Sequence, residues 1–325
     1  MTIYAAVIGT GFAARKRVEA LQEMPQVHVC AVASRQLVRA QHFGAQHQLA
    51  ACSSDDLWHD RQLNLVFICT VNADHGALVQ QALDHGKNVI VEYPLALDVE
   101  QATRLVELAR QRQLLLHVEH IELIGGLHMV MKHHLSAIGA PYYVSYRTFA
   151  PKQPAPGTWS YCPTLLGFPL MAALSRIQRL TNLLGPVDFV TCQGDVELDP
   201  ESELKYFRRC LYSARLRFCN GTLAELTYGK GEGLWQRSRY IEIRGEQGCL
   251  SFDGNHGCLT TATGEHPLKA APRQGLFQKD TQMVIDYLLH GTPLYVQPED
   301  SLYALRVAAA LQQAVELNKP VQVEA

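Results

Sequence analysis

The stretch IYAAVIGTGFAA, residues 3–14, decides the fold of the first part of this 325-residue chain. Its apolar half predicts a buried strand, and its second half, GTGFAA, is a GxGxxA motif that opens a helix. The first glycine permits a tight turn, the second lets backbone N–H groups approach a pyrophosphate, and the small last residue allows close helix–strand packing. The helix N-terminus adds partial positive charge. The motif alone is also compatible with an ordinary turn, but directly after a strand it predicts a dinucleotide site. The expected contacts are Gly9, Thr10, Gly11, Phe12 and Ala13.

Apolar runs without polar alternation recur at even spacing beyond this stretch. They lie at residues 27–33, 65–70, 88–92 and 114–118, and helical patterns separate them. Such runs are typical of strands buried on both faces of a parallel sheet. Their alternation with helices predicts a doubly wound α/β domain. We therefore expect residues 1–122 to form a Rossmann domain.

The rest of the chain, residues 123–325, has a different pattern. An apolar helix is predicted at residues 168–184, and strand-like runs recur between residues 187 and 253. Their spacing predicts an α+β domain with a large, mainly antiparallel open sheet. Two helices, at residues 278–290 and 301–317, close the chain, and the last one can pack back on the first domain.

The composition excludes several classes of protein. With 47% apolar and 18% charged residues the chain is not intrinsically disordered, and a formal net charge of −2 argues against a surface that coats nucleic acid. The nine cysteines form no CxxC pair, so neither a zinc ribbon nor a thioredoxin-like site is indicated. The first residues lack the features of a signal peptide, and no apolar run reaches about 18 residues. We expect a soluble, cytoplasmic protein with reduced thiols and no membrane partner.

The residues that end the second strand choose between the two nicotinamide dinucleotides. An acidic residue there would bind the adenine-ribose hydroxyls of NAD. Ser34 and Arg35 stand there instead, and a hydroxyl beside a guanidinium suits a 2′-phosphate. We therefore expect NADPH (NADP) as the cofactor, with a solvated surface arginine as the alternative. Lys16 and Arg17, on the first helix, could contribute to this phosphate contact, but we expect them to face solvent.

Two further strand ends carry polar residues where ligands of open α/β sheets bind. The third strand ends in TVN, residues 70–72, and the next one in EYP, residues 92–94. We expect both segments to contact the nicotinamide ribose and ring. His75, at the start of the following helix, is a further candidate, with a histidine bonded to backbone as the alternative. The expected contacts from the two strand ends are Thr70, Val71, Asn72, Glu92 and Tyr93.

The segment HVEH, residues 117–120, ends the last strand of this domain. Alternation along a strand places His117 and Glu119 on one face and His120 on the other. Because this separates the two histidines, it weakens a zinc site, and we expect no metal. Glu119 and His120, at the end of the strand, are candidates for substrate contact.

With these residues in place, the chain resembles the Gfo/Idh/MocA oxidoreductase family, whose members combine a Rossmann domain with a C-terminal α/β domain. The usual EKP motif of the family places a lysine near the nicotinamide, but EYP stands here. EYP is the form found in the biliverdin reductase branch. The chain is similar to the cyanobacterial members of that branch in further motifs, which span nearly its whole length. They are VEYPLAL (91–97), LLHVEHIELIGG (115–126), GFPLMAALSR (167–176), YGKGE (228–232), GLFQKDT (275–281) and PLYVQPEDSLYAL (293–305).

The resemblance implies NADPH-dependent reduction of biliverdin to bilirubin at the central methine carbon, C10. Arg176 is the first catalytic candidate, since a guanidinium in a largely apolar helix is costly without an anion or acceptor. We expect it to contact the substrate, and an ion pair with a carboxylate of the first domain is the alternative. Tyr93 is the second candidate and is suited by its motif to positioning. Arg179, one turn after Arg176, is expected to be more exposed and structural.

Two other functions stay open at this point. A sugar or small-carbonyl dehydrogenase of the same fold is disfavoured by Tyr93, which replaces the lysine of the family motif. A non-catalytic NADP-binding regulator would show cofactor affinity without turnover.

Overall fold

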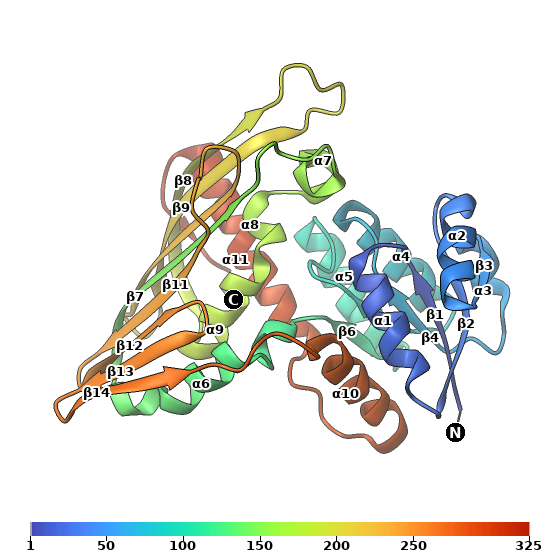
Figure 1. Ribbon diagram of the computed structural model, residues 1–325, viewed down its shortest axis with the longest axis horizontal. Coiled ribbons are helices and arrows are strands. Elements are labelled where there is room, and N and C mark those ends of the chain that lie inside the picture. Colours follow the sequence, from blue (N-terminus) through green and yellow to red (C-terminus); the bar gives the residue numbers. More distant parts are fainter. Residues whose placement is uncertain (1, 325) are drawn as a thin grey trace. The chain divides into compact units, whose positions relative to one another are not determined.

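The computed structural model describes residues 2–324, which fold into two compact units (Figure 1). The first unit comprises the chain up to Ile121 together with Gln274–Leu302. The second unit comprises Glu122–Arg273 together with the chain from Tyr303 onward.

One segment departs from the expected division of the chain. The sequence placed residues 274–302 in the second domain, whereas the structure returns them to the first unit. The physical reason is the helix α10, Leu276–His290, which buries Val284 and Ile285 in the hydrophobic core of the first unit. That core also contains Ile3 and Val18, so the segment completes the packing around the N-terminal strand and helix.

The first unit is built on a six-stranded parallel sheet in the order β3-β2-β1-β4-β5-β6. This doubly wound order confirms the predicted Rossmann fold. The strands are β1 (Ile3–Ile8), β2 (Val27–Ala33), β3 (Ala50–Cys52), β4 (Leu65–Ile68), β5 (Asn88–Val91) and β6 (Leu116–Val118). The helices are α1 (Phe12–Gln22), α2 (Leu37–His47), α3 (Ser54–His59), α4 (Asn72–Asp84), α5 (Val99–Gln111) and α10. A 3₁₀ turn follows β6 at Ile121–Leu123, and its last two residues belong to the second unit.

Two short elements of this unit were not predicted. Strand β3 has three residues, which is too short for a periodic pattern to be recognised. Helix α3 has six residues and depends on a capping box, in which the Ser53 hydroxyl accepts from the Asp56 backbone N–H and the Asp56 carboxylate accepts from the Ser53 backbone N–H.

The second unit is built on a nine-stranded sheet in the order β14-β13-β12-β11-β7-β10-β9-β8-β15. Strands β7 and β10 pair in parallel, and the other described neighbours pair antiparallel, which confirms the predicted mainly antiparallel sheet. The strands are β7 (Pro141–Pro151), β8 (Val187–Leu198), β9 (Phe207–Phe218), β10 (Leu223–Gly231), β11 (Ser238–Gly245), β12 (Gly248–Asp253), β13 (His256–Thr261), β14 (Gly264–Lys269) and β15 (Val321–Gln322).

Helices lie against one side of this sheet, as Figure 1 shows for α9. The single helix expected over residues 168–184 is interrupted at Ala173, whose φ of −100° and ψ of 21° leave the helical region. The helical elements are α6 (Gly126–His134), α7 (Pro163–Leu166), α8 (Pro169–Ala172), α9 (Leu174–Leu184), α11 (Pro298–Leu317, which begins in the first unit) and the 3₁₀ turns Leu135–Ile138 and Trp159–Tyr161. None of the helices in the described residues is long and apolar enough to cross a bilayer.

Candidate functional site

The glycine loop has the conformation that its motif predicts. Gly9 has a φ of +129°, and a Cβ atom there would collide with the carbonyl oxygen of Cys69, so a larger residue is excluded. At Gly11 a Cβ atom would meet nothing within 4 Å, which leaves open space beside the first turn of α1. No side chain caps that turn and no acidic residue lies in it. Its N–H groups are therefore available to an anion, and the loop fits the pyrophosphate of a dinucleotide.

The side chains that were expected to select the cofactor lie just after β2. Arg35 is 74% exposed, and its guanidinium lies 4.0 Å from the Asp74 carboxylate. The Ser34 hydroxyl accepts a hydrogen bond from the Gln36 backbone N–H at 3.4 Å. Both side chains are thus accessible at the carboxyl end of the sheet. Lys16 is partly exposed, as expected, and pairs with Glu19 at 2.6 Å.

His75 connects the two strand ends that were expected to flank the nicotinamide. Its Nδ1 lies 2.8 Å from the Pro94 carbonyl oxygen and its Nε2 lies 3.4 Å from the Thr70 carbonyl oxygen. Burial lowers the pKa of His75, so the ring is neutral at pH 7. His75 thus bonds to backbone carbonyl groups, which is the alternative to cofactor contact that the sequence left open. Val71 caps α4 and Asn72 is its buried first residue, and their contact with a cofactor stays a prediction.

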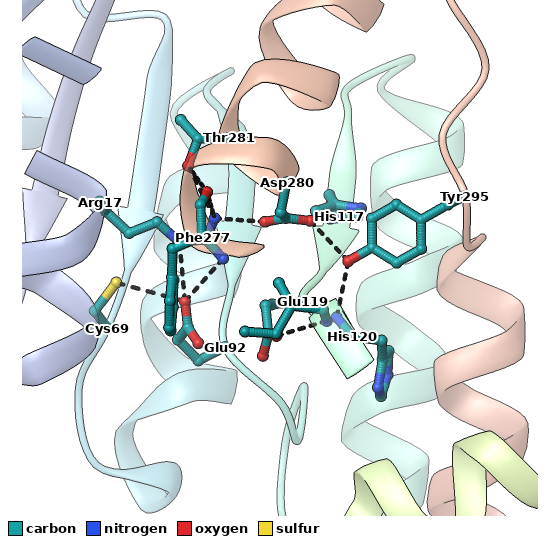
Figure 2. Close-up of polar contacts among 11 residues, drawn as sticks. Arg17, Cys69, Glu92, His117, Glu119, His120, Phe277, Asp280, Thr281 and Tyr295 are labelled. Atoms are coloured by element: carbon teal, nitrogen blue, oxygen red, sulfur yellow. Dashed lines mark hydrogen bonds and ion pairs between the residues drawn. The ribbon is translucent and has the colours of Figure 1, made fainter. Parts of the chain in front are cut away.

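Arg17 corrects the expectation that it faces solvent, because its side chain is fully buried (Figure 2). Its Nε and Nη2 donate to the same oxygen of Glu92, at 3.1 and 3.0 Å. Its Nη1 bonds to the Asp280 carboxylate and donates to the Thr281 hydroxyl at 3.0 Å. The guanidinium therefore joins the first helix, the EYP segment and α10.

Asp280 is the centre of a buried polar network. Besides Arg17, it accepts a hydrogen bond from the Tyr295 hydroxyl at 2.7 Å and lies 2.8 Å from Nε2 of His117. Burial by itself would raise the pKa of Asp280, but the charge of Arg17, together with the contact to His117, holds it well below its usual range. The Tyr295 hydroxyl also accepts from the His120 backbone N–H at 3.1 Å. The network thus fixes the end of β6.

Tyr93 lies parallel to His120, with ring centroids 5.4 Å apart and planes inclined by 3°. Nε2 of His120 lies 2.9 Å from the Ser301 hydroxyl. Burial lowers the pKa of His120 to about 3, so the ring is neutral and packs against the phenol without charge. Tyr93 is half-buried whereas His120 is fully buried, so the histidine orients the tyrosine. Its expected contact with substrate stays a prediction.

Two carboxyl groups belong to the segments on either side of Tyr93 and His120: Glu92, which is partly buried, and Glu119, which is buried. Glu119 accepts a hydrogen bond from the Ile121 backbone N–H at 2.7 Å, and Glu92 accepts from Nε and Nη2 of Arg17. Burial, and then the negative charge of Glu92, raise the pKa of Glu119 well above its usual range. These effects favour the protonated form of Glu119, whereas at Glu92 the charge of Arg17 opposes the effect of burial, which raises the pKa of that carboxyl group.

The second unit carries the other catalytic candidate. Arg176 lies on α9, where its Nη1 donates to the Ser175 hydroxyl at 3.0 Å and its guanidinium carbon lies 5.4 Å from the centroid of the Tyr228 ring. Arg176 is partly exposed. Arg179 corrects the expectation that it is the more exposed of the two, because it is 1% exposed and donates to the Glu122 carboxylate at 2.7 Å.

Several members of these clusters were not predicted from the sequence. Arg17 could have been found from its position, since it shares a helical face with the buried Ala14, Val18 and Leu21. Asp280 and Tyr295 lie within the motifs at residues 275–281 and 293–305, but their partners are far away in the sequence, so the motifs did not indicate a polar network.

Comparisons with known proteins fit this geometry. The description "Oxidoreductase family, NAD-binding Rossmann fold" matches residues 3–120, and "Oxidoreductase family, C-terminal alpha/beta domain" matches residues 135–323. Biliverdin reductase A of Mus musculus is 26% identical over 85% of this chain and 84% of its own length.

Solved structures are similar over the whole chain. A biliverdin reductase of Synechocystis sp. PCC 6803, solved with biliverdin and NADP+, is 40% identical and has a TM-score of 0.93. The match covers 97% of this chain and 99% of the Synechocystis chain. A putative myo-inositol dehydrogenase of Sinorhizobium meliloti shares the fold, with 18% identity, a TM-score of 0.81, and coverage of 99% and 100%. Since both halves of the family description match in chain order, the protein belongs to the Gfo/Idh/MocA oxidoreductase family.

Proposed function

We propose that this protein is an NADPH-dependent biliverdin reductase, which reduces biliverdin to bilirubin by hydride transfer to the methine carbon C10. One observation carries the proposal: the likeness to the Synechocystis enzyme extends over 97% of the chain at 40% identity. The Glu92-Tyr93-Pro94 segment supports it, because Tyr93 stands where the sugar and polyol dehydrogenases of the family carry lysine. A cytoplasmic location is part of the proposal and is supported by nine free cysteines.

Each unit contributes different residues to this proposal. The loop from Gly9 to Ala13 and the N-terminus of α1 hold the pyrophosphate, and Ser34 and Arg35 hold the 2′-phosphate. When bound, NADPH supplies the hydride. Tyr93, held by His120, positions the reacting groups.

Arg176 supports the electronic change in the substrate. Hydride addition at C10 raises the electron density on the pyrrole nitrogens, which then take up a proton. An arginine has a pKa above about 12 and is a poor acid. Its role is therefore to stabilise the developing charge, as preorganised donors do in other active sites.

The test mixes purified protein, NADPH and biliverdin and follows the absorption spectrum between pH 5 and 8. We expect the red-region band of biliverdin to decrease as a blue-region band of bilirubin grows. Cofactor binding without any spectral change over this pH range would contradict the proposal and favour a non-catalytic NADP-binding regulator. Turnover of small carbonyl substrates alone would favour a dehydrogenase.

The cofactor preference gives a separate prediction. The Arg35→Ala variant should use NADPH less well, with an increase in KM of roughly 10- to 100-fold, because about 1.5–3 kcal/mol of charged hydrogen bonding is lost. Its KM for NADH should change little. The measurement is the KM of wild type and variant for both cofactors at saturating biliverdin, and Arg39→Ala, an exposed arginine of α2, is the control. Equal losses for NADPH and NADH would show that Arg35 does not contact the 2′-phosphate.

A further inference from the structure

Four neighbouring strands of the second unit carry a row of polar and aromatic residues on one face of the sheet. Tyr228 of β10 stands opposite Tyr212 of β9 and Thr148 of β7, and Thr148 stands opposite Arg239 of β11. Strands are spaced by about 4.8 Å, so Arg239 lies roughly 10 Å from Tyr228 along the row. Arg176 lies over the Tyr228 ring on this same face. The row therefore begins beside the catalytic candidate and ends at Arg239.

Helix α9 confirms which face of the sheet this is. Arg179 lies over the ring of Tyr146, which is two residues before Thr148 on β7. Tyr146 stands opposite Ile241, which is two residues after Arg239 on β11, and both Tyr146 and Ile241 are buried. Because side chains two apart on a strand share a face, Thr148 and Arg239 point to the side that α9 covers.

Arg239 belongs to a cluster with more positive than negative charge. The carboxylate of Glu122 lies 2.7 Å from Arg179, 2.9 Å from Arg239 and 2.5 Å from Arg273. Burial alone would raise the pKa of Glu122, but the three guanidinium groups lower it to about 2, so the carboxylate is ionised. No second carboxylate of the described residues forms an ion pair with any of the three. Two positive charges are thus left without a counter-ion.

This surplus is costly at Arg239 in particular. Its side chain is 25% exposed, whereas that of Arg273 is 59% exposed and can be solvated. Burial lowers the pKa of Arg239 more than Glu122 raises it, which shows that one shared carboxylate does not offset the lost hydration. Arg179 alone is enough to pair with the Glu122 carboxylate, so a structural ion pair does not require Arg239.

A neighbouring group also lacks a partner. The hydroxyl of Thr148 is buried, and no described residue makes a hydrogen bond with it. Buried hydroxyl groups are nearly always hydrogen-bonded. A surplus guanidinium and an unsatisfied hydroxyl, adjacent on one face of the sheet, match the two oxygens of a carboxylate.

We propose that Arg239 and Thr148 form a subsite for a carboxylate group, with Arg273 at its rim, and that it holds one propionate of the tetrapyrrole. This subsite rests on the proposed function, because the carboxylate that Arg239 and Thr148 would bind is a propionate of biliverdin. The propionate would anchor the substrate about two strands away from the ring that Arg176 contacts.

The test compares biliverdin with its dimethyl ester, in which both propionates are masked. In the Arg239→Gln variant, KM for biliverdin should rise roughly 10- to 100-fold, the usual effect of losing one charged hydrogen bond. KM for the dimethyl ester should stay within about twofold of the wild-type value, and kcat should change little for either substrate. Thr148→Val should change KM in the same selective way by a smaller factor. The matched control is Arg244→Gln, because Arg244 lies on the same strand, is exposed and pairs with Glu242 at 2.7 Å.

Several outcomes would overturn the subsite. Equal changes of KM for acid and ester in Arg239→Gln would show a general structural role, and no change for either would show that the residue does not bind substrate. Thermal unfolding checks that the variant is folded. If Arg239→Gln does not fold, Arg273→Gln is used instead, because it replaces an exposed side chain. Arg273→Gln should raise KM for biliverdin but not for the ester, by a smaller factor, and an equal or unchanged KM for both would contradict the proposal.

Failure of the proposed function gives a different result. Wild-type protein that reduces neither bilin would contradict the reductase activity. Equilibrium titration of biliverdin and its ester into the NADP⁺ complex, followed by the bilin absorption band, still tests the subsite. Selective loss of biliverdin affinity in Arg239→Gln would support it, and unchanged affinity would overturn it.

Discussion

Replacing Arg176 with alanine is expected to lower kcat by roughly 100-fold or more, while the protein stays folded and still binds NADPH. This is the scale observed when one preorganised charge donor is removed from an active site. The side chain is partly exposed on α9, and its Nη1 donates to the Ser175 hydroxyl. The measurement is steady-state turnover of biliverdin, together with thermal unfolding and NADPH titration.

Arg176→Lys separates charge from geometry. Lysine keeps the positive charge but loses the planar donor fork, so a partial recovery of kcat would indicate electrostatic stabilisation alone. The control is Arg215→Ala, because Arg215 is 79% exposed on β9. Arg179 is unsuitable as a control, since it is buried and paired with Glu122. A folded Arg176→Ala protein with near-normal kcat would refute the catalytic role, and Tyr93→Phe would then be the next variant.

Replacing Arg17 with methionine is expected to lower the free energy of unfolding by about 3–5 kcal/mol, because the fully buried Asp280 would keep its charge without a cation and the partly buried Glu92 would lose the same partner. Chemical denaturation followed by circular dichroism measures this change. The matched control is the neighbouring Lys16→Met. Lys16 is partly exposed and pairs with Glu19, so its loss should cost less than about 1 kcal/mol.

The loss in Arg17→Met should depend on pH in a defined direction. Arg17 holds the pKa of Asp280 below the ordinary value of 3.8. A carboxyl group with a lowered pKa stabilises the fold above its unfolded-state pKa, and this contribution is lost as the pH falls through the folded-state pKa. The difference between wild type and variant should therefore be largest near neutral pH and shrink below about pH 4. A difference that does not vary with pH would show that Arg17 acts through packing alone.

The parts of the fold that could be predicted are those with local signals. The glycine loop needs only a strand, two glycines and a helix start, and all of them lie within residues 3–14. The helical spacing of α1 places Arg17 on the buried face. The burial of a charged side chain can be predicted, however, only when the residue that pairs with it is known. The partner of Arg17, Asp280, is 263 residues away, and no periodicity connects the two.

The same limit applies to the second unit. The pattern of α9 identified an arginine in an apolar helix, but it favoured the wrong exposure for Arg179. The burial of Arg179 depends on Glu122 and Tyr146, which come from other elements of the chain. Strand β14 was missed for a different reason, because its residues are nearly all exposed and show no apolar alternation.

The return of Gln274–Leu302 to the first unit affects how the protein emerges from the ribosome. Translation at about 5–20 residues per second separates Arg17 from Asp280 by roughly 13–53 s. During that interval the nascent nucleotide-binding unit holds an arginine without its aspartate and a core without α10. Most of the second unit is synthesised in the meantime. The first unit therefore cannot complete its folding before the second unit is synthesised. It needs Gln274–Leu302, and these residues follow most of the second unit in the chain.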